Sequence, residues 1–254
     1  MEIIILGSGT TVPLAERASP SLAVFTENEF ILLDIGPGTV RQLTHAGLDH
    51  ENVDCIAISH FHPDHTADLI HFIFATRYPP VLKRRKPFTV IGPRGLERFI
   101  GQLKQAYGTW LDLPDQLMRV DELSTNEQDG RVFQGFSIRS APVVHTPQSI
   151  GLRIEDRSGK TIVYSGDTAY CEAIIDLANG ADLLILESSF PDNAGREGHL
   201  TPSQAGEIAS RSGAKRLVLT HFYPESLNSD IATQCRKTYQ GELILTTDMM
   251  SLSV

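Results

Sequence analysis

The sequence has too few cysteines for a disulfide framework, with only three among 254 residues. Cys55, Cys171 and Cys235 lie far apart in apolar or helical contexts, and no two of them form a CxxC pair. Small secreted domains are rich in disulfides, and structural zinc sites commonly use paired cysteines. We therefore predict buried free thiols, a reducing cytoplasmic environment and no cysteine metal ligand.

Long hydrophobic runs are missing as well. The N-terminus has only four consecutive apolar residues, Ile3 to Leu6, and no basic leader before them. This run is too short for a signal peptide or a membrane span and is typical of a buried strand. With 41% hydrophobic and 21% charged residues, the composition is that of an ordinary globular protein. We predict one domain over residues 1–254 and no membrane association.

Positive charge is scarce, since 22 Lys and Arg face 31 Asp and Glu and leave a formal net charge of −9. A surface of this kind, taken as a whole, does not suit long nucleic acids. Bound divalent cations would concentrate positive charge at one place, where an anionic substrate could still be attracted. A small anion is therefore a better expected partner than a long nucleic acid.

Short apolar segments alternate with helical patterns along the chain. Further strands are expected between residues 117 and 163, separated by turns at Asp129-Gly130 and Ser158-Gly159. Strands with helices outside them, in two comparable halves, predict an α/β fold in which two sheets form a sandwich covered by helices. The predicted strands are 2–6, 21–26, 30–34, 55–58, 88–91, 182–187 and 216–220, and the helices 37–46, 64–77, 95–107, 173–178, 202–212 and 231–239.

Three histidines and a carboxylate crowd into six positions directly after the apolar run 55–58: His60, His62, Asp64 and His65. Imidazole and carboxylate together suit zinc and neighbouring divalent metals. His60 and His62 can point to the same side of an extended segment, because they are two residues apart. Pro63 interrupts that segment before a helix start, where Asp64 could be a plain N-cap instead of a ligand. The motif predicts a metal site.

Four further polar residues stand in comparable settings. His145, Asp167 and His221 follow predicted strands, and His199 precedes a helix whose expected N-cap is Thr201. Each is a weak signal alone, because a histidine at a strand end is often structural. Side chains at strand ends on one edge of a sandwich can nevertheless converge on one site.

Taken in order, these segments resemble the metallo-β-lactamase fold, specifically its ribonuclease Z-like phosphodiesterase branch, over nearly the whole chain. The resemblance implies two mixed β-sheets packed face to face with helices on the outer faces, an αββα sandwich. It also implies two divalent metal ions, with zinc as the first expectation and manganese or iron as alternatives. The segments similar to the family's five motifs are Leu33-Asp-Ile-Gly36, 59–69, His145, Gly166-Asp-Thr168 and Thr220-His-Phe222.

Carried over residue by residue, the resemblance implies a complete set of seven metal ligands. Two divalent ions roughly 3.5–4 Å apart can share a hydroxide of near-neutral pKa and clamp both oxygens of an in-line displacement. Asp34 would contact one of the ligand residues without binding a metal ion itself. The implied ligands are His60, His62 and His145 for one ion, Asp64, His65 and His221 for the other, and Asp167 as the bridge.

The same resemblance narrows the class of reaction that we expect. His199 looks like the family's general acid, which would protonate the departing alkoxide, and Glu187 like the glutamate that orients it. Asp64 is expected to take part in catalysis as well as in metal binding. A carboxylate holds an imidazole ring and raises its pKa toward the working range. The simpler alternatives are a surface loop histidine at His199 and a solvated strand-end carboxylate at Glu187. The set favours a phosphodiesterase that attacks with a hydroxide bridging two ions.

The sequence differs from members of the branch in one feature that bears on the expected substrate. Bacterial enzymes resembling this chain carry a long basic arm after the helix that follows a Gly-Pro turn, whereas here only nine residues, 108–116, follow that helix. We therefore expect a small phosphodiester: a cyclic nucleotide, a cyclic phosphate or a short oligonucleotide. The alternatives are ribonuclease Z-like RNA processing, a lactonase or arylsulfatase-like esterase, and an iron-dependent oxidoreductase or metal-binding scaffold. The resemblance to the family also leads us to expect a homodimer.

Other polar segments allow two interpretations. Gly7-Ser-Gly-Thr-Thr11 could offer backbone N–H groups to a phosphate or form a plain turn. Asp248 could be an outer hydrogen-bond partner of a ligand histidine, since metal-bound imidazoles usually need such a carboxylate or carbonyl. The run Lys83-Arg84-Arg85-Lys86 could contact phosphates or nucleic acid, but a solvated charged loop is the simpler explanation. The histidines that match no motif, and are expected on the surface or on helices, are His45, His50 and His71.

Overall fold

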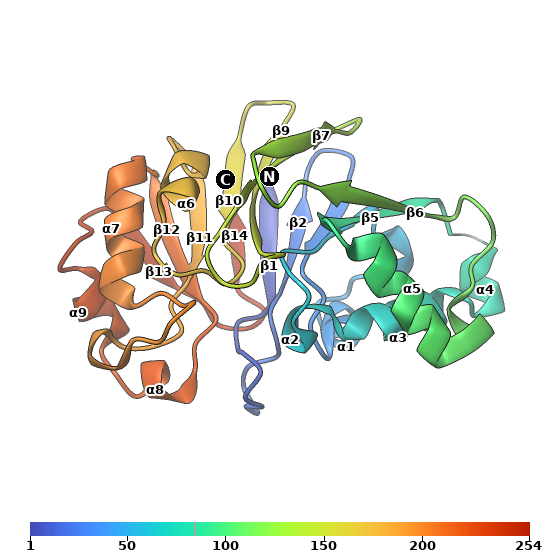
Figure 1. Cartoon of the computed structure of the whole chain (residues 1–254), viewed down its shortest axis with the longest axis horizontal. Coiled ribbons are helices and arrows are strands. Elements are labelled where there is room, and N and C mark those ends of the chain that lie inside the picture. Colours follow the sequence, from blue (N-terminus) through green and yellow to red (C-terminus); the bar gives the residue numbers. More distant parts are fainter. Residues whose placement is uncertain (84) are drawn as a thin grey trace.

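The computed structural model describes residues 1–83 and 85–254, which form two sheets of seven strands each (Figure 1). In the first sheet the order is β14-β1-β2-β3-β4-β5-β6, with β3, β4, β5 and β6 parallel. The C-terminal strand pairs with the N-terminal one, so the two chain ends lie together. The bounds are β1 Glu2–Gly7, β2 Ser21–Phe25, β3 Phe30–Leu33, β4 Cys55–Ala57, β5 Phe88–Pro93, β6 Met118–Leu123 and β14 Ser251–Ser253.

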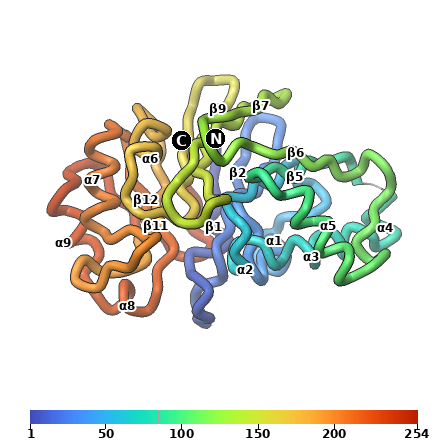
Figure 2. Tube along the Cα trace, in the orientation of Figure 1, coloured from blue at the N-terminus to red at the C-terminus, as the bar shows by residue number. Residues whose placement is uncertain are grey.

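The second sheet has the order β13-β12-β11-β10-β9-β8-β7, with β10 to β13 parallel and β7 to β10 antiparallel. Both sheets are therefore mixed. Figure 2 shows that the first half of the chain builds one side of the molecule and the second half the other. The bounds are β7 Asp129–Val132, β8 Phe136–Pro142, β9 Ile150–Asp156, β10 Thr161–Tyr164, β11 Leu183–Glu187, β12 Arg216–Thr220 and β13 Glu242–Leu245.

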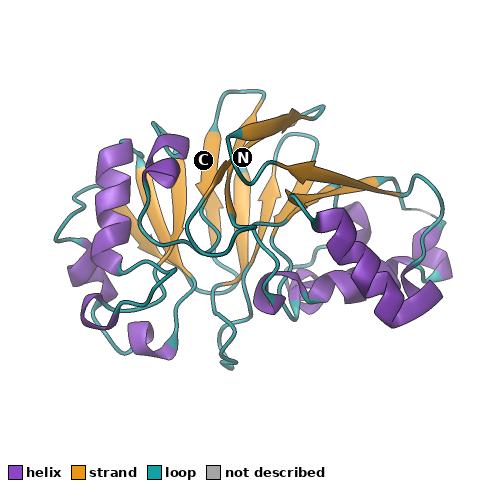
Figure 3. Ribbon diagram, viewed as in Figure 1, coloured by secondary structure: helices purple, strands orange, loops and turns teal. Residues whose placement is uncertain are grey.

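Helices cover the outer faces of both sheets (Figure 3). Among the described residues, α1 to α5 accompany the first sheet and α6 to α9 the second. The bounds are α1 Thr39–His45, α2 Pro63–Thr66, α3 Asp68–Thr76, α4 Pro79–Leu82, α5 Leu96–Tyr107, α6 Glu172–Leu177, α7 Pro202–Ser212, α8 Pro224–Leu227 and α9 Ile231–Cys235, with 3₁₀ turns at His50–Asn52, Gly108–Leu111 and Asp192–Ala194.

Three buried apolar layers hold this arrangement together. The middle layer lies between the sheets, and one outer layer lies under each set of helices. In β3, Ile31 and Leu33 face the middle layer while Leu32 faces the helices. A strand buried on both faces reads as a continuous apolar run, as the sequence of β3 does. The predicted αββα sandwich of two mixed sheets with helices on the outer faces is confirmed.

Most predicted elements are present, and three predictions were wrong in detail. The helix predicted at 64–77 is divided at Ala67 into α2 and α3, and the helix predicted at 231–239 ends at Cys235. The Asp129-Gly130 pair begins β7 instead of forming a turn, because Gly130 pairs with Arg139 in the antiparallel ladder. No helix in the described part of the chain is long and apolar enough to cross a membrane.

The basic run 83–86 is not a freely solvated loop. Arg84 lies outside the described residues. Arg85 is buried, donates to the carbonyls of Glu51 and Val53, and lies 4.4 Å over the ring of Phe88. Burial lowers the pKa of Arg85 to about 10. The interpretation as a solvated loop is wrong for Arg85, which instead fastens this segment to the first sheet.

Candidate metal centre

The predicted ligands stand where strands end at one edge of the sandwich. His60 and His62 follow β4, and His145 follows β8. Asp167 follows β10 and His221 follows β12. Because β10, β11 and β12 are parallel neighbours, their carboxyl ends meet at the same edge of the second sheet. The fold therefore brings together residues that are up to 161 positions apart in the sequence.

Two groups of predicted ligand atoms form at this edge, each with its members within 4.8 Å of one another: His60, His62, His145 and Asp167 in one, and Asp64, His65 and His221 in the other. A third possible group consists of Asp167, His199 and His221 and shares two of these residues. Asp167 lies between the groups. Its Oδ1 is 3.3 Å from His65 Nε2 and 3.4 Å from His221 Nε2. Its Oδ2 is 3.7 Å from His145 Nε2 and 3.9 Å from His60 Nε2. All seven residues predicted as ligands converge, and Asp167 has the position of a bridge.

Several of these atoms are buried without a hydrogen-bond partner among the described residues. They are His60 Nε2, His65 Nε2, His221 Nε2 and Asp167 Oδ1. Buried polar atoms are nearly always paired, because leaving one unpaired costs on the order of 1–3 kcal/mol. Four unpaired atoms that face one another form a donor set of imidazole nitrogen and carboxylate oxygen. The set fits divalent cations of the zinc type.

Asp34 and Ser59 determine which nitrogens face the centre in the first motif. The carboxylate of Asp34 accepts from Ser59 Oγ at 2.8 Å and lies 2.7 Å from His65 Nδ1. Since the Ser59 hydroxyl already donates to Asp34, it accepts from His60 Nδ1 at 3.0 Å. Both rings therefore carry their outer proton on Nδ1 and turn Nε2 toward the centre. Asp34 has the predicted supporting position.

The second half of the chain uses the same arrangement. His145 Nδ1 lies 2.9 Å from the carbonyl of Gly198, which only accepts. His221 Nδ1 lies 2.9 Å from Ser189 Oγ, whose hydroxyl donates to Glu187. Nε2 of each ring is thus directed inward. His62 differs, because its Nδ1 lies 3.0 Å from His145 Nε2 and is the atom it presents to the first group.

Burial and neighbouring charges shift the pKa values of residues in the centre. Burial would raise the pKa of Asp167, but His221 and His65 outweigh it and hold that pKa well below its usual range. Burial would lower the pKa of His65, but Asp167 and Asp34 raise it well above its usual range. Burial and the neighbouring His65 lower the pKa of His60, so its ring is neutral. A cation that binds here displaces a proton from His65, so its affinity must depend on pH.

Two of the four non-glycine residues that have a positive φ in the described part of the chain belong to the centre. Asp34 has φ 58° and His221 has φ 59°, and both lie in the left-handed region that non-glycine residues rarely adopt. Gly166, directly before Asp167, has φ 57°, and a Cβ there would lie 2.6 Å from Ser59 Oγ. Strain of this kind persists where the surroundings over-determine it, typically at functional sites.

His199 and Glu187 form a pair at the rim of the centre. His199 Nδ1 lies 2.9 Å from Glu187 Oε1, and the ring is partly exposed. Glu187 is 1% exposed and also accepts the backbone N–H groups of Thr168 and Leu200. Burial lowers the pKa of His199, but the hydrogen bond and charge of Glu187 outweigh it, so the pKa lies above its ordinary value. The alternative of a solvated glutamate is wrong for Glu187, which is buried. His199 is a partly exposed loop residue before α7, and its ring is paired with Glu187.

The predicted helix start after His199 is also present. Thr201 is the N-cap of α7, and its side chain forms a capping box with Gln204. This cap fixes the backbone directly after His199, so the ring is held from both the helix and Glu187.

Aromatic rings that were not predicted lie beside His199. Tyr223 stacks on Phe190 at 4.6 Å, and its ring centroid lies 5.8 Å from that of His221 and 6.1 Å from that of His199. Burial and the nearby Asp64 and Asp167 raise the pKa of Tyr223 to about 12, so its hydroxyl keeps its proton. Tyr223 lies two residues after the ligand candidate His221, and this position is the feature of the sequence from which its place near the centre could have been predicted.

The structure decides against one interpretation of Asp248 and favours one of the two interpretations of the Gly7–Thr11 segment. Asp248 accepts from Ser8, from the N–H of Ala18 and from Gln42, so it supports a loop instead of a ligand histidine. Within the Gly7–Thr11 segment, the Ser8 N–H binds Asp248 and the Gly9 N–H binds the carbonyl of Ala18. Both N–H groups therefore already have acceptors within the protein, and the interpretation of the segment as a plain turn is the better one.

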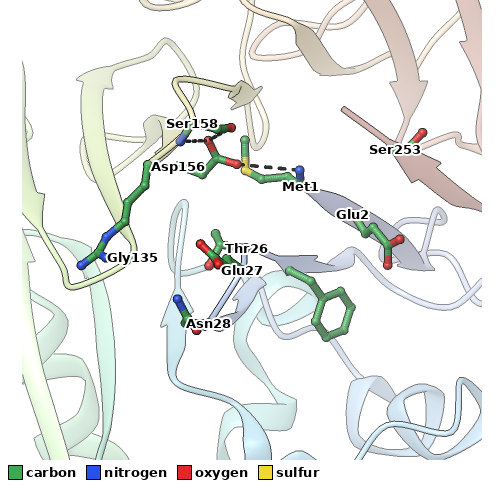
Figure 4. Close-up of a pocket in the computed structure, with 11 residues that line it drawn as sticks. Met1, Glu2, Thr26, Glu27, Asn28, Gly135, Asp156, Ser158 and Ser253 are labelled. Atoms are coloured by element: carbon green, nitrogen blue, oxygen red, sulfur yellow. Dashed lines mark hydrogen bonds and ion pairs between the residues drawn. The ribbon is translucent and has the colours of Figure 1, made fainter.

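A separate hollow of about 480 Å³ lies beside the chain ends (Figure 4). Met1 and Asp156 line it, with the N-terminal amine 3.8 Å from Asp156 Oδ2. Met1 precedes β1, whereas Ser8, past the other end of that strand, bonds to the N–H of Phe222 beside His221. The hollow is therefore at the opposite end of the sandwich from the metal centre.

Comparison with known proteins agrees with this geometry. The family model of the Beta-lactamase superfamily domain matches residues 29–222. The chain belongs to the β-lactamase superfamily. It is a metal-dependent hydrolase of the metallo-β-lactamase type, and its sequence is similar to that of the Ribonuclease Z of Methanothermobacter thermautotrophicus, with 28% identity over 306 positions that cover 100% of this chain and 97% of the relative.

Solved structures of the superfamily superpose on nearly all of the chain. The metallo-β-lactamase fold protein YhfI from Bacillus subtilis gives a TM-score of 0.84 at 22% identity and covers 99% of this chain and 98% of its own. Human tRNase Z, short form, gives a TM-score of 0.79 at 25% identity, with 100% and 99% covered. The predicted resemblance to the ribonuclease Z-like branch is confirmed.

Proposed function

We propose that this protein is a binuclear metal-dependent phosphodiesterase that acts on small phosphodiesters. One observation carries the proposal: His199, held by Glu187, stands beside Asp167 and His221 at the edge of the centre. A hydrolase that cleaves a bond with a good leaving group has little need for such an acid. A phosphodiester with an alkoxide leaving group needs one, because the departing oxygen must be protonated.

The residues that would hold the ions are His60, His62 and His145 for one and Asp64, His65 and His221 for the other, with Asp167 shared. Zinc suits this donor set best, and manganese and iron are accepted by the same ligands. A pair of bound divalent ions supplies an activated water at neutral pH and neutralises charge on the reacting phosphoryl group.

The residues of the chain do the rest. Glu187 fixes the His199 ring through Nδ1, so Nε2 is the atom that would deliver a proton to the leaving oxygen. Asp34 and Ser59 keep the His60 and His65 rings in orientation and so maintain the spacing of the two groups. Tyr223, whose ring lies 6.1 Å from that of His199 and whose hydroxyl keeps its proton, would be a neutral donor for a phosphoryl oxygen.

Small substrates are supported by the short connection after α5. Only one 3₁₀ turn, Gly108–Leu111, and a few residues precede β6, so no long arm extends from this place in the described chain. The alignment with the Methanothermobacter Ribonuclease Z spans 306 positions, although this chain has 254 residues, so that relative has residues without a counterpart here. RNA processing remains the second candidate, since that relative and the human structure are both named for it.

A substrate panel tests the proposal. Zinc-loaded and manganese-loaded protein should hydrolyse bis(p-nitrophenyl) phosphate and at least one of a cyclic nucleotide, a cyclic phosphate or a dinucleotide. Turnover of a tRNA precursor with inactivity on all small diesters would favour the RNA-processing candidate. Cleavage of lactones or aryl sulfates alone would favour an esterase, and one bound iron without hydrolysis would favour an oxidoreductase or a binding scaffold.

Other properties of the protein remain proposals. Cys55 and Cys235 are buried free thiols and Cys171 is a half-buried one, which supports a reducing cytoplasm. A single domain is supported by the apolar layer shared between the two sheets. A homodimer stays a prediction from the family resemblance.

A further inference from the structure

Each half of the chain contains a buried carboxylate that holds two histidine rings, one directly and one through a serine. In the first half, Asp34 lies 2.7 Å from His65 Nδ1. It reaches His60 through Ser59, whose hydroxyl bonds to Asp34 at 2.8 Å and to His60 Nδ1 at 3.0 Å. Both rings are predicted metal ligands, so this carboxylate and its serine serve the metal centre alone.

The second half repeats the arrangement with Glu187 and Ser189. Glu187 Oε1 lies 2.9 Å from His199 Nδ1, and the Ser189 hydroxyl donates to Glu187 Oε2. The same Ser189 Oγ lies 2.9 Å from His221 Nδ1 and 3.3 Å from His199 Nδ1. Here only His221 is a predicted ligand, whereas His199 is the proposed acid. Ser189 therefore stands where the metal centre and the acid meet.

The register of two parallel strands fixes the position of Ser189. Glu187, the last residue of β11, is paired with Thr220, the last residue of β12. The Ser188 N–H donates to the carbonyl of Thr220 at 2.9 Å, which continues the contact beyond the strand ends. Ser189 and His221 follow directly, so their side chains meet. Ser189 is 0% exposed, and water does not compete for its hydroxyl.

The direction of each hydrogen bond in this chain follows from its acceptor. The Glu187 oxygens also accept the backbone N–H groups of Thr168 and Leu200, and the one proton of the Ser189 hydroxyl goes to the same carboxylate. The lone pairs of that hydroxyl then accept from His221 Nδ1. Hydrogen bonds in series polarise one another, most strongly in a dry interior. A change at His221 is thus transmitted to Glu187.

We propose that Ser189 is a positioning residue that couples the metal ion held by His221 to the orientation of the His199 ring. Removing its hydroxyl would deprive His221 Nδ1 of its acceptor and Glu187 of one donor, so both rings would be held less firmly. The inference rests on the proposed function, because it takes His199 as the acid of a phosphodiesterase. A serine that only fills space in the interior would have neither effect.

Zinc affinity, measured by competition with a chelating dye on the full-length chain, tests the His221 side without any substrate. Ser189→Ala should raise the Kd of one of the two zinc ions about 10- to 100-fold, the usual effect of removing the outer partner of a ligand. Ser189→Cys keeps the volume but is only a weak donor, and should behave like Ser189→Ala. Ser189→Thr keeps the hydroxyl and should stay close to the wild type.

Ser188→Ala is the matched control. Ser188 is also 0% exposed, but its Oγ has no hydrogen-bond partner in the described part of the chain. Its removal should leave the zinc Kd and the rates unchanged. Circular dichroism of the metal-free proteins verifies that each variant is folded. Equal effects of Ser188→Ala and Ser189→Ala would indicate loss of packing and overturn the inference.

Rates at saturating zinc test the His199 side. Ser189→Ala should lower kcat about 10- to 100-fold on a diester with an alkoxide leaving group, because displacing a reacting group by about 1 Å can cost 100-fold. KM should change little, since both ions are bound under these conditions. On bis(p-nitrophenyl) phosphate the loss should be smaller, because nitrophenolate departs without a proton. Ser189→Thr should restore kcat on the alkoxide diester.

A double-mutant cycle distinguishes coupling from two independent effects. Glu187→Gln and Ser189→Ala are made singly and together, and the zinc Kd is measured for the four proteins. If Ser189 links His221 to Glu187, the second substitution should change the Kd little once the first is present. Effects that multiply would overturn the coupling.

The outcomes keep this inference separate from the proposed function. An unchanged zinc Kd in folded Ser189→Ala overturns the inference and leaves the phosphodiesterase in place. Equal losses of kcat on both diesters at saturating zinc also overturn it, since they would show that Ser189 holds His221 alone. If the wild type hydrolyses no phosphodiester, the proposed function fails, and the zinc Kd values and the cycle still decide whether Ser189 links His221 to Glu187.

Discussion

Replacing Asp167 with alanine is expected to lower metal affinity more than about 100-fold, the upper end of the effect of removing an outer partner of a ligand. The reason is its position, since its two oxygens face His65 and His221 on one side and His60 and His145 on the other. Purified Asp167→Ala should contain fewer than two metal equivalents per chain when measured by plasma mass spectrometry.

A thermal readout checks the same variant without activity. Metal bound only by the native state stabilises it by about 4 kcal/mol at a metal concentration 1,000 times the Kd. EDTA should therefore lower the Tm of the wild type clearly and that of Asp167→Ala little. Asp182→Ala is the matched control, because Asp182 is also a buried aspartate but bonds to Thr161 and Lys215 outside the centre. That variant should lose stability and keep its metal. Full metal content in Asp167→Ala would contradict the proposal that Asp167 binds both metal ions.

Replacing His199 with alanine is expected to reduce turnover about 10²- to 10⁴-fold on diesters with an alkoxide leaving group, the usual contribution of a general acid. On bis(p-nitrophenyl) phosphate the loss should be less than about tenfold, because nitrophenolate departs without a proton. The measurement compares kcat/KM for both substrates in the wild type and the variant, with metal content determined in each sample.

His45→Ala provides the control for the His199 variant. His45 is an exposed histidine of α1 that contacts Gln42 and lies outside the cluster, so both rates should be unchanged. Equal losses on the two diesters in His199→Ala, with metal retained, would contradict the general-acid role. They would indicate instead that the ring holds the substrate or the shape of the centre.

The local part of the centre could be predicted from the sequence, because four side chains stand within six positions after a strand. His145, Asp167 and His221 became convincing through the resemblance, and their convergence depends on strand order that one sequence does not reveal. Ser59 and Ser189 could not be assigned, since a serine next to a histidine is common and only the fold shows its hydroxyl linking that ring to a carboxylate.

Tertiary packing explains the predictions that failed. Asp248 follows a strand, as the ligand candidates do, but the end of β13 lies beside the loop of Ser8 and Ala18, so its carboxylate satisfies that loop. Arg85 carries a charge that favours solvent, yet the rings of Phe72 and Phe88 cover its guanidinium while two carbonyls accept from it. The contact between Phe74 and Trp110 was not predicted, because these residues are separated by 36 positions and meet only when the 3₁₀ turn Gly108–Leu111 packs on α3.

Two metal ions at this edge of the sandwich can be detected by anomalous diffraction at the zinc edge from crystals of the metal-loaded wild type. We expect two peaks about 3.5–4 Å apart. One should lie between His60, His62 and His145, the other between Asp64, His65 and His221, and Asp167 should contact both. A single peak, or peaks away from these side chains, would contradict a two-metal centre at this edge of the sandwich.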